Sequence, residues 1–327
     1  MQIENNRVFL RVSLFIATIV VSATSVFGQS WAIRDTGEKV DLVASYFTSA
    51  NRGFVGGDGG YLASTTDGGA TWTKYPLNTK EDVNEIYFRN EDNGYIVAGK
   101  LVYSTTDGGK TWQQSRIVSD SEFKGGTPVF SSIRYSDKKR GLAIGSIVNK
   151  RDEIIDSLVM RTSDGGDSWQ RVIIPTKNEL FHLDFNGNSH GWIVGDKGLI
   201  LATTDSGETW TIQASGVTRA LFAVDFRDDN DGVAVGGGGT IVRTTNGGQT
   251  WENVITPFKE TLKRVAFSDD SNGWAVGHKG TILRTADKGR SWGRQSSPVA
   301  LDFYGLYISK RYGCAVGEAG TTITFQR

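Results

Sequence analysis

The chain has 327 residues, and 36 Lys and Arg are balanced by 36 Asp and Glu, so its formal net charge at pH 7 is zero. This balance, without a basic run on a predicted helix, leaves no electrostatic basis for binding nucleic acid. The one cysteine, Cys314, excludes an intrachain disulfide, and one Cys with three His gives no support for a metal site or a catalytic triad.

The N-terminus has the three parts of a secretory signal peptide. Arg7 and Arg11 precede an apolar run from residue 12 to residue 21, and small residues then lead to Gly28. The run is short for a membrane span, so we expect cleavage after Gly28, with an uncleaved anchor as the alternative. We therefore predict a signal peptide over residues 1–28 and an exported domain, periplasmic or secreted, over residues 29–327.

An eight-residue motif recurs six times through the predicted domain. Its pattern is Ser/Thr-x-Asp-x-Gly-x-Thr/Ser-Trp, and its tryptophans recur at about 41 residues, with one longer step between Trp112 and Trp169. The acidic position is held by Asp67, Asp107, Asp164, Asp205, Asn246 and Asp287, and the tryptophans are Trp72, Trp112, Trp169, Trp210, Trp251 and Trp292. A fixed period of this length indicates a repeat architecture.

Each part of this motif, the Asp-box or BNR repeat, has a structural explanation. The Thr ends a strand, the Asp side chain accepts hydrogen bonds from backbone N–H groups of its own turn, and the glycines supply positive φ. The Trp opens the next strand and buries its ring between neighbouring sheets. We interpret the Asp-box as a stapled hairpin turn rather than a catalytic or metal-binding site.

The repeat between residues 179 and 213 contains four short predicted strands. Phe181, Leu183 and Phe185 alternate with other residues and indicate an inner strand. The other three strands are expected at Trp192–Gly195, Leu199–Thr203 and Trp210–Gln213. Four antiparallel strands in about 40 residues are typical of one β-propeller blade.

The last repeat predicts how the ring closes. It runs from Tyr304 to Gln326, ends after its third strand and has no Asp-box, whereas Ser30–Ile33 matches the Ser/Thr-Trp start of a fourth strand. We therefore expect an all-β, seven-bladed β-propeller whose N-terminal strand completes the last blade and leaves no open edge. Cys314 aligns with Trp192 of another repeat, which predicts a buried packing role.

Two segments, Val118–Gly126 and Ser146–Ser157, break the period. In a four-stranded blade, interblade loops and the turns between second and third strands share one face of the ring, opposite the Asp-boxes. Insertions on a rigid scaffold often carry recognition, although solvated loops also vary without a function. The candidate partner-binding residues in these two segments are Phe123, Lys124, Lys150 and Arg151.

The combined pattern Gly-Trp-x-Val-Gly-x-x-Gly-x-Ile-x-x-Thr-x-Asp-x-Gly-x-Thr-Trp stands, with variations, at Gly191–Trp210, Gly232–Trp251 and Gly273–Trp292. It resembles the photosystem II stability/assembly factor family of cyanobacteria and chloroplasts, and related propellers of non-photosynthetic bacteria, over essentially the whole predicted domain. The resemblance implies a seven-bladed, non-enzymatic propeller that binds assembling membrane-protein subunits and carries an arginine-rich patch. The arginines on repeat positions are Arg161, Arg219, Arg243, Arg264 and Arg284.

The resemblance favours an exported, non-enzymatic scaffold whose partner is a membrane or envelope protein, with peripheral contact to a membrane as an open alternative. A glycoside hydrolase or a carbohydrate-binding propeller is the competing hypothesis, because sialidases and other glycosidases also carry Asp-boxes. The nearest match to the sialidase Arg-Ile-Pro motif is Ile33-Arg34-Asp35, which lacks the proline.

A carboxylate-pair glycosidase needs two acids that flank a sugar. Asp184 and Asp225 hold equivalent positions on predicted inner strands, where the next repeat has Ala266. We interpret these acids as lining a solvated channel and expect no catalytic residue. No Gly-rich segment precedes a predicted helix, so the sequence predicts no cofactor.

Overall fold

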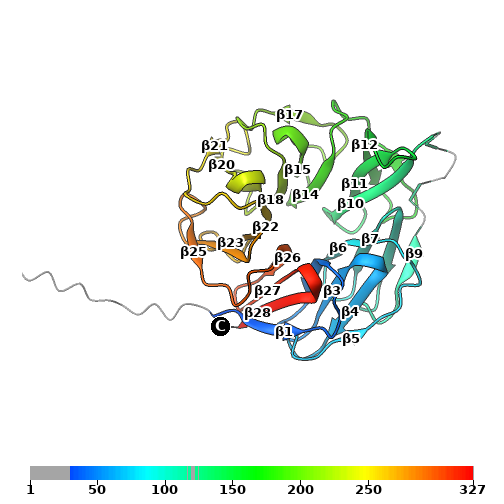
Figure 1. Ribbon diagram of the computed structural model, residues 1–327. Coiled ribbons are helices and arrows are strands. Elements are labelled where there is room, and N and C mark those ends of the chain that lie inside the picture. Colours follow the sequence, from blue (N-terminus) through cyan, green and yellow to red (C-terminus); the bar gives the residue numbers. More distant parts are fainter. Residues whose placement is uncertain (1–29, 116, 119–121, 124, 327) are drawn as a thin grey trace, which may run out of the picture.

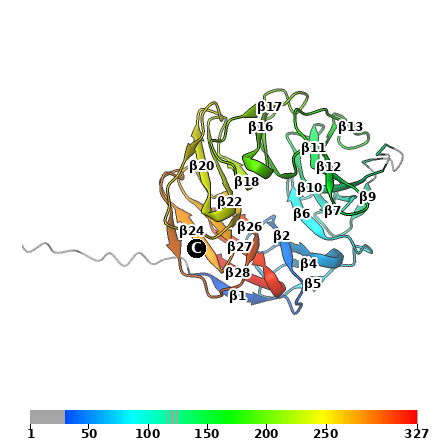
Figure 2. The ribbon, with the colours of Figure 1, turned by 45° about the horizontal axis from the view of Figure 1, so that its top comes forward.

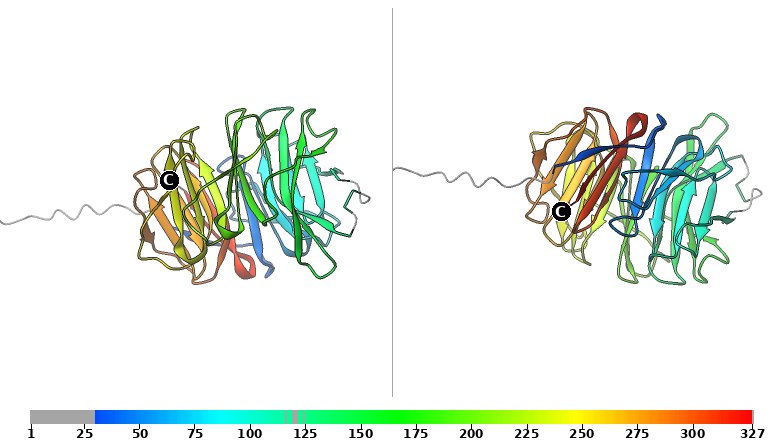
Figure 3. Two further views of the ribbon diagram at one scale, coloured as in Figure 1. Left: turned by 90° about the horizontal axis from the view of Figure 1, so that it is seen from above. Right: turned by 90° about the horizontal axis from the view of Figure 1, so that it is seen from below.

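The computed structural model describes residues 30–115, 117–118, 122–123 and 125–326. Within these residues, 28 strands form seven four-stranded antiparallel sheets, which stand as blades around a common axis (Figures 1 and 2). Side views show the strands running steeply along that axis (Figure 3). The predicted all-β, seven-bladed propeller is confirmed, whereas the predicted signal peptide lies outside the described residues.

Each blade follows the same order from the axis outward. The inner strands are β2 (Leu42–Phe47), β6 (Val83–Phe88), β10 (Thr127–Tyr135), β14 (Leu180–Asn186), β18 (Leu221–Phe226), β22 (Leu262–Phe267) and β26 (Phe303–Ile308). The second strands are β3 (Gly53–Gly57), β7 (Gly94–Ala98), β11 (Gly141–Val148), β15 (His190–Gly195), β19 (Asp231–Gly236), β23 (Gly273–Gly277) and β27 (Tyr312–Gly317). The third strands are β4 (Tyr61–Thr65), β8 (Leu101–Thr105), β12 (Ile154–Thr162), β16 (Ile200–Thr203), β20 (Ile241–Thr245), β24 (Thr281–Thr285) and β28 (Thr321–Gln326).

The outer strands are short and begin directly after the repeated tryptophan, except in the last blade. They are β5 (Thr73–Lys74), β9 (Gln113–Ser115), β13 (Gln170–Arg171), β17 (Thr211–Gln213), β21 (Glu252–Asn253), β25 (Gly293–Gln295) and the N-terminal β1 (Ala32–Asp35). Four short 3-10 turns connect second to third strands: η1 (Asp58–Gly60), η2 (Asp196–Gly198), η3 (Gly237–Gly239) and η4 (Glu318–Gly320).

A glycine ends most of the second strands because a backbone carbonyl passes too close for a side chain. A Cβ on Gly195 would clash with the carbonyl oxygen of Glu179, the residue just before inner strand β14. The same clash recurs at Gly57, Gly236, Gly277 and Gly317 against the residue before their own inner strands. The glycine of the repeated Val-Gly dipeptide is therefore required by the close approach of the second strand to the residue before the inner strand.

The Asp-box forms the predicted staple. Thr65 ends β4, and its hydroxyl accepts the N–H of Gly69 at 2.9 Å and donates to the Asp67 carboxylate at 2.7 Å. The same carboxylate accepts the Thr71 N–H at 2.9 Å and the Thr71 hydroxyl at 2.6 Å. These bonds from Thr71 lower the pKa of Asp67 to about 2. At Asn246 the amide oxygen accepts the same N–H, and Nδ2 donates to the hydroxyl of Thr250.

The repeated tryptophans pack between neighbouring blades, as predicted. Trp112 lies edge-on to Phe88 of its own blade and to Phe54 of the preceding blade, with ring centroids 5.7 and 6.0 Å apart. Each hydrophobic cluster likewise combines buried residues of two adjacent blades. The core is thus a ring of interblade layers, and every blade depends on both neighbours.

Strand β1 completes the last blade by pairing antiparallel with β28, which confirms the predicted closure. Trp31 precedes β1 and packs edge-on against Phe325 at 4.7 Å, in a cluster that also contains Trp274 of the preceding blade. Trp31 therefore supplies the tryptophan that the truncated last repeat lacks. Cys314 is fully buried, also as expected.

The two faces of the ring differ as the repeat predicts. The Asp-box turn contacts the turn between first and second strands, where Gly68 donates its N–H to Asn51. On the opposite face, Asp58 in η1 donates its N–H to Asp41 in the loop before β2. We call this second side the hairpin face, because β11 and β12 extend beyond the other blades there and end in a turn over residues 149–153.

Phe123, which precedes β10 in the chain, lies against the base of this extended hairpin. Phe123 is only 6% exposed and packs in one cluster with Ile147 of β11. The guanidinium of Arg171 lies over the Phe123 ring at 5.4 Å. The Phe123 ring is therefore part of the packed scaffold and is not exposed to a partner, contrary to what its place in an insertion suggested.

Replacing Asp205 with Ala tests the Asp-box staple. Asp205 accepts the N–H and the hydroxyl of Thr209, so Asp205→Ala should destabilise the protein by about 1 kcal/mol or more. Asp205→Asn should cost less, because Asn246 already fills the equivalent position. Denaturant unfolding measures both changes. An unchanged stability in Asp205→Ala would show that the turn does not need the carboxylate.

Replacing Trp31 with Ala tests ring closure. Removing this buried ring should cost on the order of 3 kcal/mol, since it empties the interface between the last two blades. Ile33 on the same strand is 57% exposed, so Ile33→Ala is a matched control with little expected effect. Equal melting temperatures for the two variants would argue against β1 as the closing element.

Candidate binding site in the central channel

Every inner strand carries a β-bulge, near its start in six strands and in the middle of the longer β10, which turns consecutive side chains toward the axis. The register shifts lie between Leu42 and Ala44 in β2 and at the equivalent position of each other inner strand. The bulged residues are Val43, Asn84, Ser131, Phe181, Phe222, Lys263 and Tyr304. A simple alternation therefore fails here: Leu180 and Leu183 are both fully packed, and Phe181 lies between them facing the channel.

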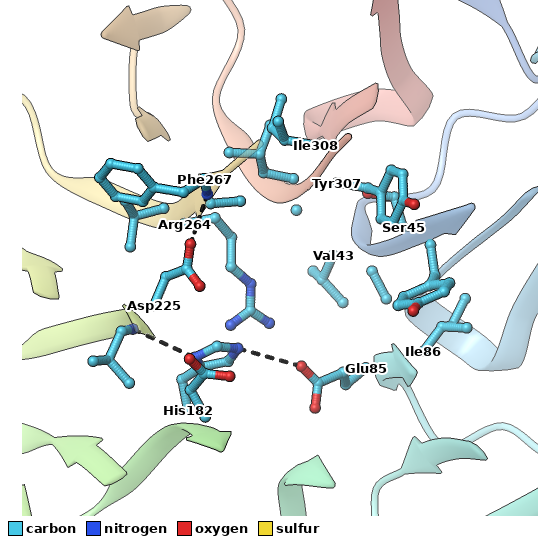
Figure 4. Close-up of a pocket in the computed structure, with 18 of the residues that line it drawn as sticks. Val43, Ser45, Glu85, Ile86, His182, Asp225, Arg264, Phe267, Tyr307 and Ile308 are labelled. Carbon is cyan, nitrogen blue, oxygen red and sulfur yellow. Dashed lines mark hydrogen bonds and ion pairs between the residues drawn. The ribbon is translucent and has the colours of Figure 1, made fainter. Parts of the chain in front are cut away.

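Two cavities follow one another along the axis. The mouth chamber, about 340 Å³, opens toward the hairpin face, and the central chamber, about 220 Å³, lies toward the Asp-box face. Val43 and Arg264 line both chambers. Figure 4 shows the Arg264 side chain reaching across the channel toward His182 and Glu85. Arg264 therefore stands at the boundary between the two spaces.

Most polar channel residues satisfy the backbone of the next blade. Glu85 accepts the N–H of Ile133 at 2.9 Å, Asp184 that of Phe226 at 2.8 Å, and Asp225 that of Phe267 at 2.6 Å. Other channel side chains donate to backbone carbonyl oxygens of the next blade. Tyr46 donates to Phe88, Tyr87 to Tyr135, and Asn84 to Phe130. The inner strands are sheet edges, so these side chains replace the missing neighbouring strand.

Glu85, Arg134 and His182, from three successive blades, form the most buried charged cluster of the channel. Arg134 pairs with Glu85 at 2.8 Å and lies over the ring of Tyr87. Burial opposes ionisation of Glu85, but Arg134 and His182 hold the pKa of its carboxyl below the ordinary value. Burial lowers the pKa of His182 to about 4. The neutral ring accepts the Val224 N–H at Nδ1 and faces Glu85 through Nε2.

Asp184 and Asp225 form an acidic pair near the Asp-box face. Burial raises the pKa of both carboxyls, and the charge of Asp184 raises that of Asp225 further. One oxygen of each is held by a backbone N–H of the next blade. This geometry makes the two acids interblade staples, and the pair shares the channel with the cation Arg134.

The five arginines on repeat positions lie at three separate places. Arg161, Arg243 and Arg284 sit on third strands, where Arg161 pairs with Glu208 at 2.7 Å and the buried Arg243 donates to the Lys288 carbonyl. Arg284 lies over the ring of Trp274 at 5.3 Å and donates to Asn272. Arg219 is exposed on the hairpin face, and Arg264 is in the channel. The five arginines therefore do not form one patch.

The candidate partner-binding residues of the two insertions also lie at different places. Lys150 and Arg151 are exposed at the tip of the extended hairpin, whose turn is held by Asn149 and Glu153. Phe123 is buried at its base, and Lys124 lies outside the described residues. Within the described part of the chain, no group of three His, Cys, Asp or Glu side chains could hold a metal ion. The same residues include no helix long and apolar enough to span a membrane.

A family model matches most of the chain. The family model described as photosynthesis system II assembly factor YCF48 matches the chain in overlapping segments at residues 23–128, 72–177, 162–256, 212–296 and 250–309. The chain belongs to the YCF48 family. No curated protein sequence gives a match. The arginine distribution described above is therefore that of one member of the YCF48 family.

Solved structures share the fold at low sequence identity. YCF48 bound to a D1 peptide superposes with a TM-score of 0.72 at 20% identity, covering 91% of this chain and 97% of that one. YCF48 from Cyanidioschyzon merolae gives 0.68 at 18% identity, with 91% and 98% covered. Virginiamycin B lyase from Staphylococcus aureus gives 0.72 at 12% identity, with 91% and 99% covered. These likenesses show the propeller fold, which an enzyme also uses.

Sequence reasoning missed several channel residues of this YCF48 family member. Glu85, Arg134 and Lys263 are ionisable residues on inner strands, and each differs from the residues at the equivalent position of the two neighbouring blades. A comparison of the repeats at inner-strand positions could have found them. Their contacts could not be found in that way, because these depend on how side chains of neighbouring blades meet in the channel.

Replacing Asp225 with Asn tests the acidic pair. A raised folded-state pKa means that the folded protein holds a proton that the unfolded chain releases, so this stabilisation is present at low pH and lost as pH rises above the ordinary Asp value. Asp225→Asn keeps an acceptor for the Phe267 N–H and should stabilise the protein at pH 8 by on the order of 1 to 2 kcal/mol, with less effect at pH 4.

Denaturant unfolding at the two pH values measures the effect. The matched control is Asp205→Asn, because the pKa of the Asp205 carboxyl is lowered and its contribution has the opposite dependence on pH. A destabilisation of Asp225→Asn that grows with pH would show that an ionised Asp225 is needed in the folded state.

Proposed function

We propose that this protein is an exported, non-catalytic scaffold that binds a membrane or envelope protein and assists its assembly or stability. The observation that carries the proposal is the match to the YCF48 assembly-factor family along the repeats. A solved YCF48 with a D1 peptide bound supports a protein partner. The binding region proposed is the hairpin face, where the mouth chamber opens beside the extended β11–β12 hairpin.

The proposal of export depends on the N-terminal pattern of Arg7, Arg11 and the apolar run that follows. N-terminal sequencing of protein recovered outside the cytoplasm should give a sequence that begins near Gln29. Recovery of the chain with Met1 in the cytoplasmic fraction would contradict export.

The proposal of a non-catalytic role is supported by how the channel acids are used. Asp184 and Asp225 each commit an oxygen to a backbone N–H, and Glu85 is held by Arg134 and by the N–H of Ile133. These acids stabilise the ring, and none of them is left wholly available as a general acid or nucleophile. The protein, incubated with a panel of polysaccharides, should therefore release no reducing ends. Reproducible release would favour the glycosidase alternative.

Shortening the extended hairpin tests the proposed binding face. Residues 148–155 can be replaced by Asn-Gly, because the remaining Ile147 and Asp156 are paired and a two-residue turn fits between them. The variant should keep its melting temperature within a few degrees and lose partner capture from an envelope fraction.

The matched control is Lys197→Gly in η2. It removes an exposed cation from the same face at a residue with φ of 56°, a conformation that glycine adopts readily. This control should capture the partner as the parent protein does. Capture that survives hairpin shortening would place the partner elsewhere, and loss of folding would make the hairpin part of the scaffold.

A further inference from the structure

The mouth chamber combines an apolar wall with an open side. Phe181 and Phe222 approach within 5.0 Å between ring centroids, at an angle of 47°, and Tyr304 lines the same cavity. Val148 and Ile154 of the extended hairpin form part of the rim. Ile154 is 37% exposed, so apolar surface continues from the chamber onto the hairpin. A ligand that covers both regions must be longer than a small molecule in the chamber.

Two consecutive cations project into this chamber. The bulge between Leu262 and Arg264 turns Lys263 and Arg264 toward the same cavity. The ammonium of Lys263 lies 3.9 Å from the centroid of the Phe222 ring. Among the described residues, neither cation has a carboxylate oxygen within 4.0 Å, which sets them apart from Arg134 with its partner Glu85.

The nearest acids, among them Glu179 of the same chamber, compensate the charge of these cations only in part. Glu85 acts on Arg264 from a distance but is engaged by Arg134, and Glu179 and Asp302 act on Lys263 only through space. Burial lowers the pKa of both Lys263 and Arg264, which reflects the cost of holding unpaired charge away from water. A carboxylate that enters the chamber would recover part of that cost.

We propose that the mouth chamber recognises an extended internal segment of a partner protein through an Asp or Glu side chain next to an aromatic or aliphatic residue. The carboxylate pairs with Lys263 and Arg264, and the apolar neighbour packs against Phe181, Phe222 and the hairpin rim. This inference rests on the proposed function, that the protein binds a protein partner, and assigns the chemistry of the bound segment.

A protein segment fits this surface better than an anionic membrane does. The hairpin tip carries Lys150 and Arg151 but also Asp152 and Glu153, so it has no net positive charge with which to attract lipid headgroups. The free cations are recessed in the chamber rather than spread over the face. An acidic side chain of a peptide segment that crosses the mouth along the hairpin can reach these cations, whereas the flat surface of a membrane cannot.

Selection from a random decapeptide library, displayed between two fixed flanking domains so that only internal segments are offered, tests the proposal. Enriched sequences should place Asp or Glu beside an aromatic or aliphatic residue. A synthetic copy of an enriched decapeptide, acetylated and amidated, should bind Lys263→Gln and Arg264→Gln about tenfold more weakly than the parent protein. Changing the peptide's acid to its amide should produce a similar loss.

The matched control is Arg219→Gln, which removes an exposed cation from the same face outside the chamber and should leave peptide affinity unchanged. Phe222→Leu separately tests the apolar wall, and melting curves verify that each variant is folded. The proposal is overturned by enrichment without acidic residues, by equal binding to Lys263→Gln and Arg264→Gln, or by no peptide binding while vesicles with anionic lipids retain the protein.

Failure of this site and failure of the scaffold role can be told apart. If the double variant Lys263→Gln/Arg264→Gln captures the same envelope partner as the parent protein, the chamber is not the recognition site and the scaffold role stands. If neither protein captures a partner and no peptide is enriched, both are wrong.

Discussion

The structure depends on how the inner edge of each blade is satisfied. An inner strand has a paired neighbour on one side and the channel on the other, so part of its backbone would be left without hydrogen bonds. Side chains of the preceding blade supply them: Glu85 binds the N–H of Ile133, and Asp184 binds that of Phe226. The interblade tryptophans add apolar packing farther out in the same interfaces. Polar residues in the channel are thus part of the scaffold before they are candidates for function.

This constraint separates structural charges from available ones. Arg134, Glu85 and Asp225 are charged or titratable residues of the channel, but each has a partner that the ring needs. Lys263 and Arg264 line the mouth chamber, and among the described residues they form no ion pair and no side-chain hydrogen bond to a backbone group. Holding two cations in a half-buried cavity without a counterion is unfavourable, so their presence needs an explanation outside the folded ring. A ligand that supplies a carboxylate is the simplest one.

The sequence was sufficient to predict the fold because the repeat is easily recognised in it. The period near 41 residues, the stapled turn at Asp67 and the unmatched Trp31 each have one structural solution, and all three were found. The binding surface was less predictable. The bulge at Lys263 changes which side chains face the axis, and an alternating pattern does not reveal such a one-residue shift. Burial of Phe123 depends on a contact with Ile147 that local sequence does not encode.

The arginines show why a repeat position is a poor guide to a surface patch. Equivalent residues in a propeller are related by rotation about the ring axis, so Arg161 and Arg243 fall on different blades and point to different neighbours. Residues that cooperate come instead from non-equivalent positions on neighbouring blades, as Glu85 and Arg134 do, or from consecutive positions at a bulge, as Lys263 and Arg264 do. Recognition in such a ring is therefore set by departures from the repeat. In this chain the largest departures, the extended β11–β12 hairpin and the cationic bulge of β22, border the same chamber.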